Sequence, residues 1–126
     1  MALKNTSGAI YFNTSLNAPT LTVDADVNEL HLKGDVQVSA PVVFNNTGHL
    51  RLGNVESDIL LFANGLTATA PSSIGLAGKI RSTNAAMVLG RSTASITLWN
   101  DTEIDTGSGT LQISSPTHAD VYKLSI

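Results

Sequence analysis

The sequence has no cysteine, few aromatic residues and few charges. Of its 126 residues, 5% are aromatic and 13% are charged, against roughly 25% charged residues in a typical soluble protein. The absence of cysteine excludes a disulfide scaffold and thiolate metal sites. The low aromatic content argues against the usual core of an antiparallel β-sandwich. The low charge predicts a surface that packs against copies of itself or against a larger assembly, because an isolated soluble monomer normally carries more charge.

Positive charge is scarce as well. The chain has 7 Lys and Arg against 10 Asp and Glu, a formal net charge of −3, and no run of basic residues. Nucleic acid is therefore not a predicted partner, because neutralising phosphates requires a basic patch. No apolar stretch follows Lys4, and no apolar run approaches the length of a membrane-spanning helix, so neither a signal peptide nor a membrane partner is predicted.

A short alternating motif recurs along the chain. The segments Leu30–Gly34 and Leu50–Asn54 both place polar residues between leucines and end in a turn signal. Alternation with period two is typical of a strand with one buried and one solvent-facing side. Four anchor residues follow one another at gaps of about 20, 24 and 22 residues, which is the period of a stacked repeat: Leu32, Leu52, Leu76 and Leu98.

The predicted fold is all-β, a short parallel β-helix of about five coils. The alternative is an antiparallel β-sandwich or jelly roll, which the strand content alone also permits. We expect an N-terminal arm or cap over residues 1–17, solenoid repeats over 18–114 and a C-terminal strand or cap over 115–126. The residues expected to be buried are Leu21, Val23, Leu30, Leu32, Val36, Val38, Leu50, Leu52, Ile74, Leu76, Met87, Leu89, Ile96, Leu98, Leu111 and Ile113.

Three segments carry a family resemblance. Residues 66–90 (LTATAPSSIGLAGKIRSTNAAMVLG) resemble the repeats of filamentous-haemagglutinin-type adhesins and related bacterial β-strand-repeat surface proteins. Residues 48–53 (GHLRLG) and 109–114 (GTLQIS) are similar to the Gly-x-Leu-x-Leu pieces of those repeats. The resemblance implies a right-handed β-helix with a structural or adhesive role, and it carries no catalytic residues.

The overall profile also resembles small phage virion proteins, such as capsid decoration proteins or fibre segments. The predicted function is that of a non-enzymatic structural protein that self-assembles, by analogy as a trimer, and braces or decorates a larger particle such as a capsid. Its expected location is the virion. The alternative is a fragment of a secreted adhesin that binds a host or glycan surface, located outside cells or at the cell surface.

No catalytic, cofactor-binding or metal-binding residue is predicted, although three groups of polar side chains resemble parts of such sites. Asp24, Asp26 and Asn28 alternate as the start of a calcium loop would, but Glu29 stands where the turn glycine belongs, so a solvated turn is favoured. His31 and His49 should point outward and lie near each other if their coils stack in register, while His118 stands apart. The local carboxylate pairs Glu56 with Asp58 and Glu103 with Asp105 are expected to be exposed.

Overall fold

The described part of the chain is built from short strands. The computed structural model describes residues 1–4, 8–119 and 122–126, and these form no helix. In chain order the strands are β1 (Ala2–Leu3), β2 (Ala9–Phe12), β3 (Leu16–Ala18), β4 (Thr22–Val23), β5 (Glu29–Leu32), β6 (Val36–Val38), β7 (Val42–Val43), β8 (His49–Leu52), β9 (Ile59–Phe62), β10 (Leu66–Ala68), β11 (Ser73–Arg81), β12 (Met87–Leu89), β13 (Ser95–Asp105), β14 (Leu111–Ile113), β15 (Thr117–His118) and β16 (Leu124–Ser125).

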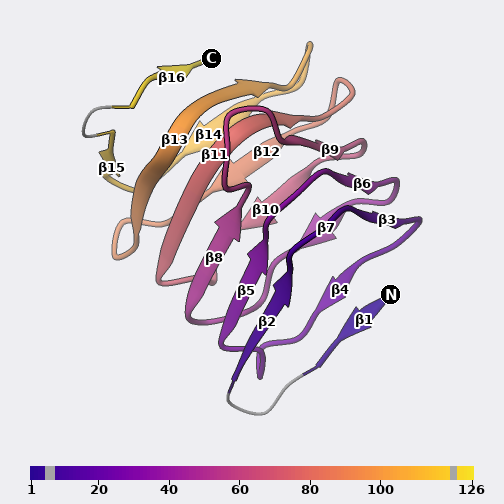
Figure 1. The fold of residues 1–126 in the computed structure, drawn as a ribbon. Coiled ribbons are helices and arrows are strands. Elements are labelled where there is room, and N and C mark those ends of the chain that lie inside the picture. The colour runs from indigo at the N-terminus through magenta and orange to yellow at the C-terminus, as the bar shows by residue number, and fades with distance from the viewer. Residues whose placement is uncertain (5–7, 120–121) are drawn as a thin grey trace.

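The strands coil into a parallel β-solenoid of about 5 turns (Figure 1). Face 1 consists of β1, β4, β7, β10, β12 and β14. Face 2 consists of β2, β5, β8, residues 73–76 of β11, residues 95–98 of β13, and β15. Face 3 consists of β3, β6, β9, residues 78–81 of β11, residues 102–105 of β13, and β16. Every ladder between the strands is parallel, so the antiparallel sandwich is not the fold.

The alternating motif directs every second side chain into the solenoid. Leu32, Leu52, Leu76 and Leu98 lie in register in one interior column, which confirms the repeat inferred from their spacing. Of the residues expected to be buried, all are buried except Leu111 and Ile113, which are partly exposed. These two belong to β14, the last strand of its ladder, so no further turn covers them.

Close stacking at the corners selects glycine at particular positions. Gly53 follows β8 with a φ of 81°, a left-handed conformation that residues with a Cβ rarely adopt. Its N–H donates to the carbonyl oxygen of Leu32 in the turn below, at 2.8 Å, and a Cβ on Gly53 would collide with the carbonyl oxygen of Ala77 in the turn above. At this corner the backbone of Gly53 therefore extends the hydrogen bonding between turns of the solenoid, and there is no room for a side chain.

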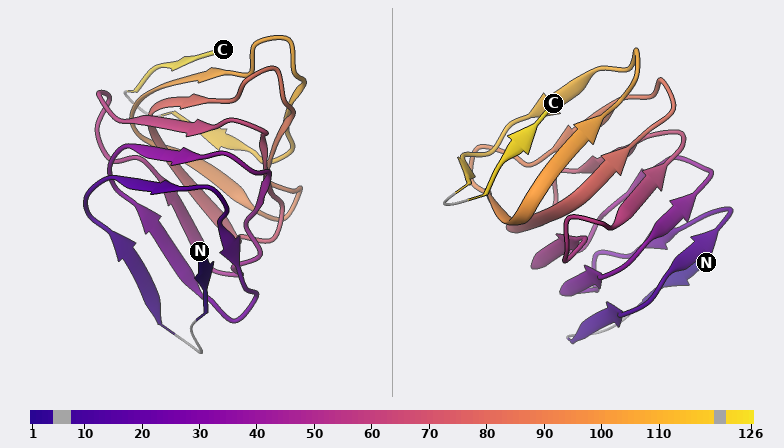
Figure 2. Two further views of the ribbon diagram at one scale, coloured as in Figure 1. Left: turned by 90° about the vertical axis from the view of Figure 1, so that its right-hand side faces the viewer. Right: turned by 45° about the horizontal axis from the view of Figure 1, so that its top comes forward.

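The ladders extend toward both ends of the described chain. Within residues 1–17, β1 and β2 pair with β4 and β5, and β3, which begins there, pairs with β6. Within residues 115–126, β15 and β16 pair with the two halves of β13. Figure 2 shows the first turn, in indigo, at one end of the stack and the last strands, in yellow, at the other. The strands at each end therefore have a ladder neighbour on one side only.

Candidate functional site

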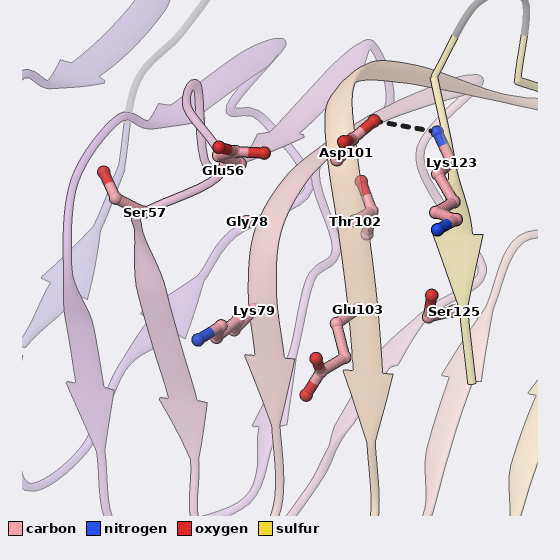
Figure 3. A pocket seen from close by; sticks show the side chains of 9 residues that line it. All are labelled: Glu56, Ser57, Gly78, Lys79, Asp101, Thr102, Glu103, Lys123 and Ser125. Atoms are coloured by element: carbon pink, nitrogen blue, oxygen red, sulfur yellow. Dashed lines mark hydrogen bonds between the residues drawn. The ribbon is translucent and has the colours of Figure 1, made fainter.

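A shallow polar pocket of about 400 Å³ lies on face 3 where the ladder approaches β16. The side chain of Asp101 accepts a hydrogen bond from the backbone N–H of Lys123 at 2.9 Å, as Figure 3 shows. The carboxylate of Glu103 lies 3.5 Å from the guanidinium of Arg81. The lining residues are Glu56, Ser57, Gly78, Lys79, Asp101, Thr102, Glu103, Lys123 and Ser125.

The carboxylate pairs that are local in the sequence do not act as pairs in the structure. Asp58 is buried, and its Oδ2 accepts hydrogen bonds from the backbone N–H groups at positions 54 and 55, at 2.9 and 3.2 Å. Asp105 accepts one from the N–H of Gly107 at 2.8 Å. The pocket receives only Glu56 and Glu103, one member of each pair. Asp58 is therefore not exposed as expected, because it is needed to close the turn before β9.

The segment that alternates like the start of a calcium loop, residues 24–28, lies in the turn between β4 and β5. The carboxylate of Asp24 lies 3.9 Å from the ammonium group of Lys4. The backbone carbonyl of Asn28 accepts hydrogen bonds from the next turn, among them one from Gly48 N–H at 2.8 Å. Within residues 1–4, 8–119 and 122–126, no group of three or more His, Cys, Asp and Glu side chains could hold a metal ion.

His31 and His49, on face 2, lie as the sequence predicts. The flanking leucines are buried, so His31 and His49 point outward, and their ring centroids are 5.4 Å apart. His31 is in register with Arg51, so the two imidazoles meet diagonally across neighbouring strands. His118 is exposed in β15, on the same face but in register with Thr97.

Two aromatic residues extend this pair into a row across face 2. We call Tyr11, His31, His49, Arg51 and Trp99 the aromatic ladder. Tyr11 stacks on His31 with a centroid separation of 4.5 Å and an interplanar angle of 18°. His49 meets Trp99 edge to face at 6.2 Å, and the Cζ of Arg51 lies 4.5 Å from the Trp99 ring centroid. Such stacked and cation–π contacts hold exposed rings in fixed orientations.

Gly75 explains how Trp99 reaches the earlier strands. Gly75 lies in register between Arg51 and Thr97, at an outward position of β11. A Cβ built on Gly75 would collide with the Nε1 and Cδ1 atoms of Trp99. The indole therefore lies across the strand at the one outward position of that row without a side chain, and it meets both Arg51 and His49 on the far side.

The charged groups at the aromatic ladder are of both signs: Arg51 and Lys33 are cations, and Glu29 is an anion. Burial lowers the pKa of both histidines, and for His31 the neighbouring His49 lowers it further. Burial also lowers the pKa of Arg51, and the ammonium group of Lys33 lies 5.0 Å from the Tyr11 ring centroid. Glu29, in the same strand as His31, acts in the opposite direction and raises the pKa of both imidazoles.

The aromatic members of the ladder are not among the residues that the sequence pattern singles out. Tyr11 is directly in register with His31, and the Ala9–Phe12 strand carries the alternation that would have placed it outward. Trp99 follows Leu98 and is likewise at an outward position. In a chain with 5% aromatic residues, outward-facing aromatic side chains are the available signal. Their exposed fractions, 52% for Tyr11 and 44% for Trp99, are high for residues of this size.

Comparisons of the chain with protein-family models, curated proteins and solved structures found no match. Over the described ranges, no helix is long and apolar enough to cross a membrane.

Proposed function

We propose that this chain is a non-enzymatic structural module that assembles with copies of itself, as a homotrimer, and braces or decorates a larger particle such as a phage capsid. The observation that carries the proposal is a broad surface without charged residues. It covers face 1 and the neighbouring strands β3, β6 and β9 of face 3. We call it the uncharged surface.

The strands of face 1 contain no charged residue from β1 to β14. Val43, near its centre, is 49% exposed although its neighbours on either side are buried. The parallel register aligns the outward side chains into one row, and all of them are small, apolar or neutral polar: Ala2, Thr22, Val43, Thr67, Val88 and Gln112.

The uncharged surface continues around one corner onto face 3. The strands β3, β6 and β9 also contain no charged residue. Their outward row is Asn17, Gln37 and Leu61, and Ile59 beside it is 42% exposed. Two different uncharged faces that share a corner can contact each other between copies, and such a heterologous contact closes into a ring when the rotation allows it. A trimer is the ring that we propose.

The ends of the stack give the second reason to expect assembly. Isolated edge strands are usually protected by charged residues, particularly lysine. The first 20 residues, which include all three strands of the first turn, hold a single charged side chain, Lys4. Contact through uncharged surface also requires no desolvation of ions, which is the main cost of burying charge. The first turn of the solenoid therefore has little charge that would oppose contact with another protein.

The assembly is tested with a charge placed at the centre of the uncharged surface. Val43→Lys adds an ammonium group at an outward position of face 1, and Thr97→Lys adds the same charge at an outward position of face 2. Sedimentation equilibrium at micromolar concentration should give a trimer for the wild type and for Thr97→Lys, and a monomer for Val43→Lys. A monomeric wild type, or an unchanged mass for Val43→Lys, would refute the proposal.

The aromatic ladder favours a second candidate function, that of an adhesin module that binds a host or glycan surface. The ladder lies on face 2 and does not overlap the uncharged surface, so both functions can belong to one molecule. Exposed, fixed aromatic rings beside cations are suited to ligand contact rather than to the core. Binding of the wild type to a glycan array, with loss of binding in Trp99→Ala, tests this candidate.

A further inference from the structure

Arg51 is a fixed cation that has no anionic partner among the described residues. Its Nε donates to the carbonyl oxygen of Gly53 at 3.2 Å, and its guanidinium is further held against the ring of Trp99. The ion pairs found among the described residues, Lys4 with Asp24 and Arg81 with Glu103, do not include it. Burial lowers the pKa of Arg51, which means that its charged form has lost part of its hydration. An anion at this position would replace the lost hydration with charge-assisted hydrogen bonds.

The rings beside Arg51 offer an apolar surface to the same ligand. Trp99 is 44% exposed. Its indole packs against the guanidinium of Arg51 and occupies the space that a side chain at position 75 would fill. A second cation–ring pair, Lys33 over Tyr11, stands at the other end of the histidine pair. Because these side chains are already ordered by their mutual contacts, a ligand loses little affinity to ordering them.

We propose that the aromatic ladder binds a carboxylated saccharide of the uronic-acid class, with the carboxylate at the guanidinium of Arg51 and a sugar ring against the indole of Trp99. A uronic acid combines a planar anion, which matches the fork of a guanidinium, with a ring whose C–H face is apolar. The second pair, Lys33 with Tyr11, would contact a further sugar unit of an oligomer. This proposal rests on the second candidate function, because it names the ligand of that surface.

Other ligand classes fit the aromatic ladder less well. A neutral sugar would stack on the rings but leave Arg51 without an anion. A nucleic acid would stack as well, but its affinity depends on several phosphate contacts. The ladder region provides two fixed cations, Arg51 and Lys33, beside the carboxylate of Glu29, on a chain of net charge −3. A single carboxylate with an attached sugar ring matches this set of groups most closely.

Trp99 provides a direct measurement of binding, because it is the single tryptophan of the chain. The probe is trigalacturonate, titrated to millimolar concentration while the Trp99 emission is followed, with calorimetry as an independent readout. Maltotriose is the neutral control and hexathymidylate the nucleic-acid control. We expect saturable binding of trigalacturonate, and none of either control in the same range. Binding of maltotriose with equal affinity, or tighter binding of hexathymidylate, would overturn the ligand class.

Two variants place the ligand on the ladder. Arg51→Gln should weaken trigalacturonate binding about tenfold or more, through the loss of a charge-assisted contact. Gly75→Ala should also weaken it, because the added Cβ displaces the indole while every ligand-contacting group remains. Arg81→Gln, on face 3, is the matched control and should bind as the wild type does. Equal affinity of Arg51→Gln and Arg81→Gln would refute the site.

This test is independent of the assembly proposal. Val43→Lys changes the uncharged surface and leaves the aromatic ladder intact, so it should bind trigalacturonate with the affinity of the wild type even as a monomer. If the wild type forms a trimer yet shows no saturable binding, the saccharide proposal fails and the assembly proposal stands.

Discussion

Replacing Leu52 by alanine tests the register of the solenoid at its centre. Leu52 is fully buried and lies between Leu32 and Leu76 in the interior column. The strands on either side are held by ladder hydrogen bonds, so the column cannot close over the lost carbon atoms. Truncating a buried leucine costs about 2–5 kcal/mol, depending on how far the cavity collapses. We expect Leu52→Ala to lower the free energy of unfolding by about 4 kcal/mol, which corresponds to a fall of about 10–20 °C in the melting temperature for a domain of this size.

The matched control is Leu61→Ala, the same substitution in the same turn. Leu61 lies at an outward position of β9 and is only partly buried, between the buried residues Leu60 and Phe62. Its loss should cost less than about 1 kcal/mol. Because Leu61 belongs to the uncharged surface, both substitutions are made in the Val43→Lys background, which is expected to be monomeric, and each is compared with that background by thermal and urea denaturation, followed by circular dichroism. Similar destabilisation by the two substitutions would show that the inward and outward assignments are wrong.

Two further predictions concern polar groups of the fold. Because burial lowers the pKa of His31 and His49 below 6.5, the unfolded chain takes up more protons than the folded one as the pH falls below that value, and the free energy of unfolding decreases. In denaturant titrations between pH 7.5 and 5, His31→Phe should reduce this decrease in the free energy of unfolding. An unchanged pH dependence in His31→Phe would contradict the lowered pKa of His31. Asn46 is fully buried and donates to two backbone carbonyls, so Asn46→Ala should cost about 1–3 kcal/mol, and more than the exposed Asn64→Ala in the same denaturation assay. Equal losses for the two asparagines would show that burial adds nothing to the contribution of these hydrogen bonds.

The alternation of apolar and polar residues is a local property, and it was sufficient to predict most of the core. In Leu30–Leu32 and Leu50–Leu52 the leucines face inward in the structure as the pattern requires. The stacking of Leu32, Leu52, Leu76 and Leu98 could also be predicted, because the turns absorb their unequal spacing. The longest gap contains the turn at residues 53–58, closed by the buried carboxylate of Asp58.

Contacts between turns could be predicted only where register follows directly from the repeat. The approach of His31 and His49 is such a case, since each occupies an outward position next to the buried leucines of the same motif. The grouping of Glu56 with Glu103 is not, because these residues are far apart in the sequence and belong to different turns of the solenoid. Local spacing suggested that Glu56 pairs with Asp58 and Glu103 with Asp105. Both aspartates instead accept hydrogen bonds from backbone N–H groups within a few residues of themselves.

The sequence by itself determined the class of fold, the period of the repeat and the side of each strand that is buried, because these depend on the alternation of side chains within a strand. The tertiary structure alone decided which outward residues become neighbours. Trp99 meets Arg51 because parallel register puts Gly75 between their strands and leaves open space there. The uncharged surface likewise arises because strands from every turn align on face 1. Such neighbours are fixed by the lengths of the turns and by the hydrogen bonds between them, which no single strand contains.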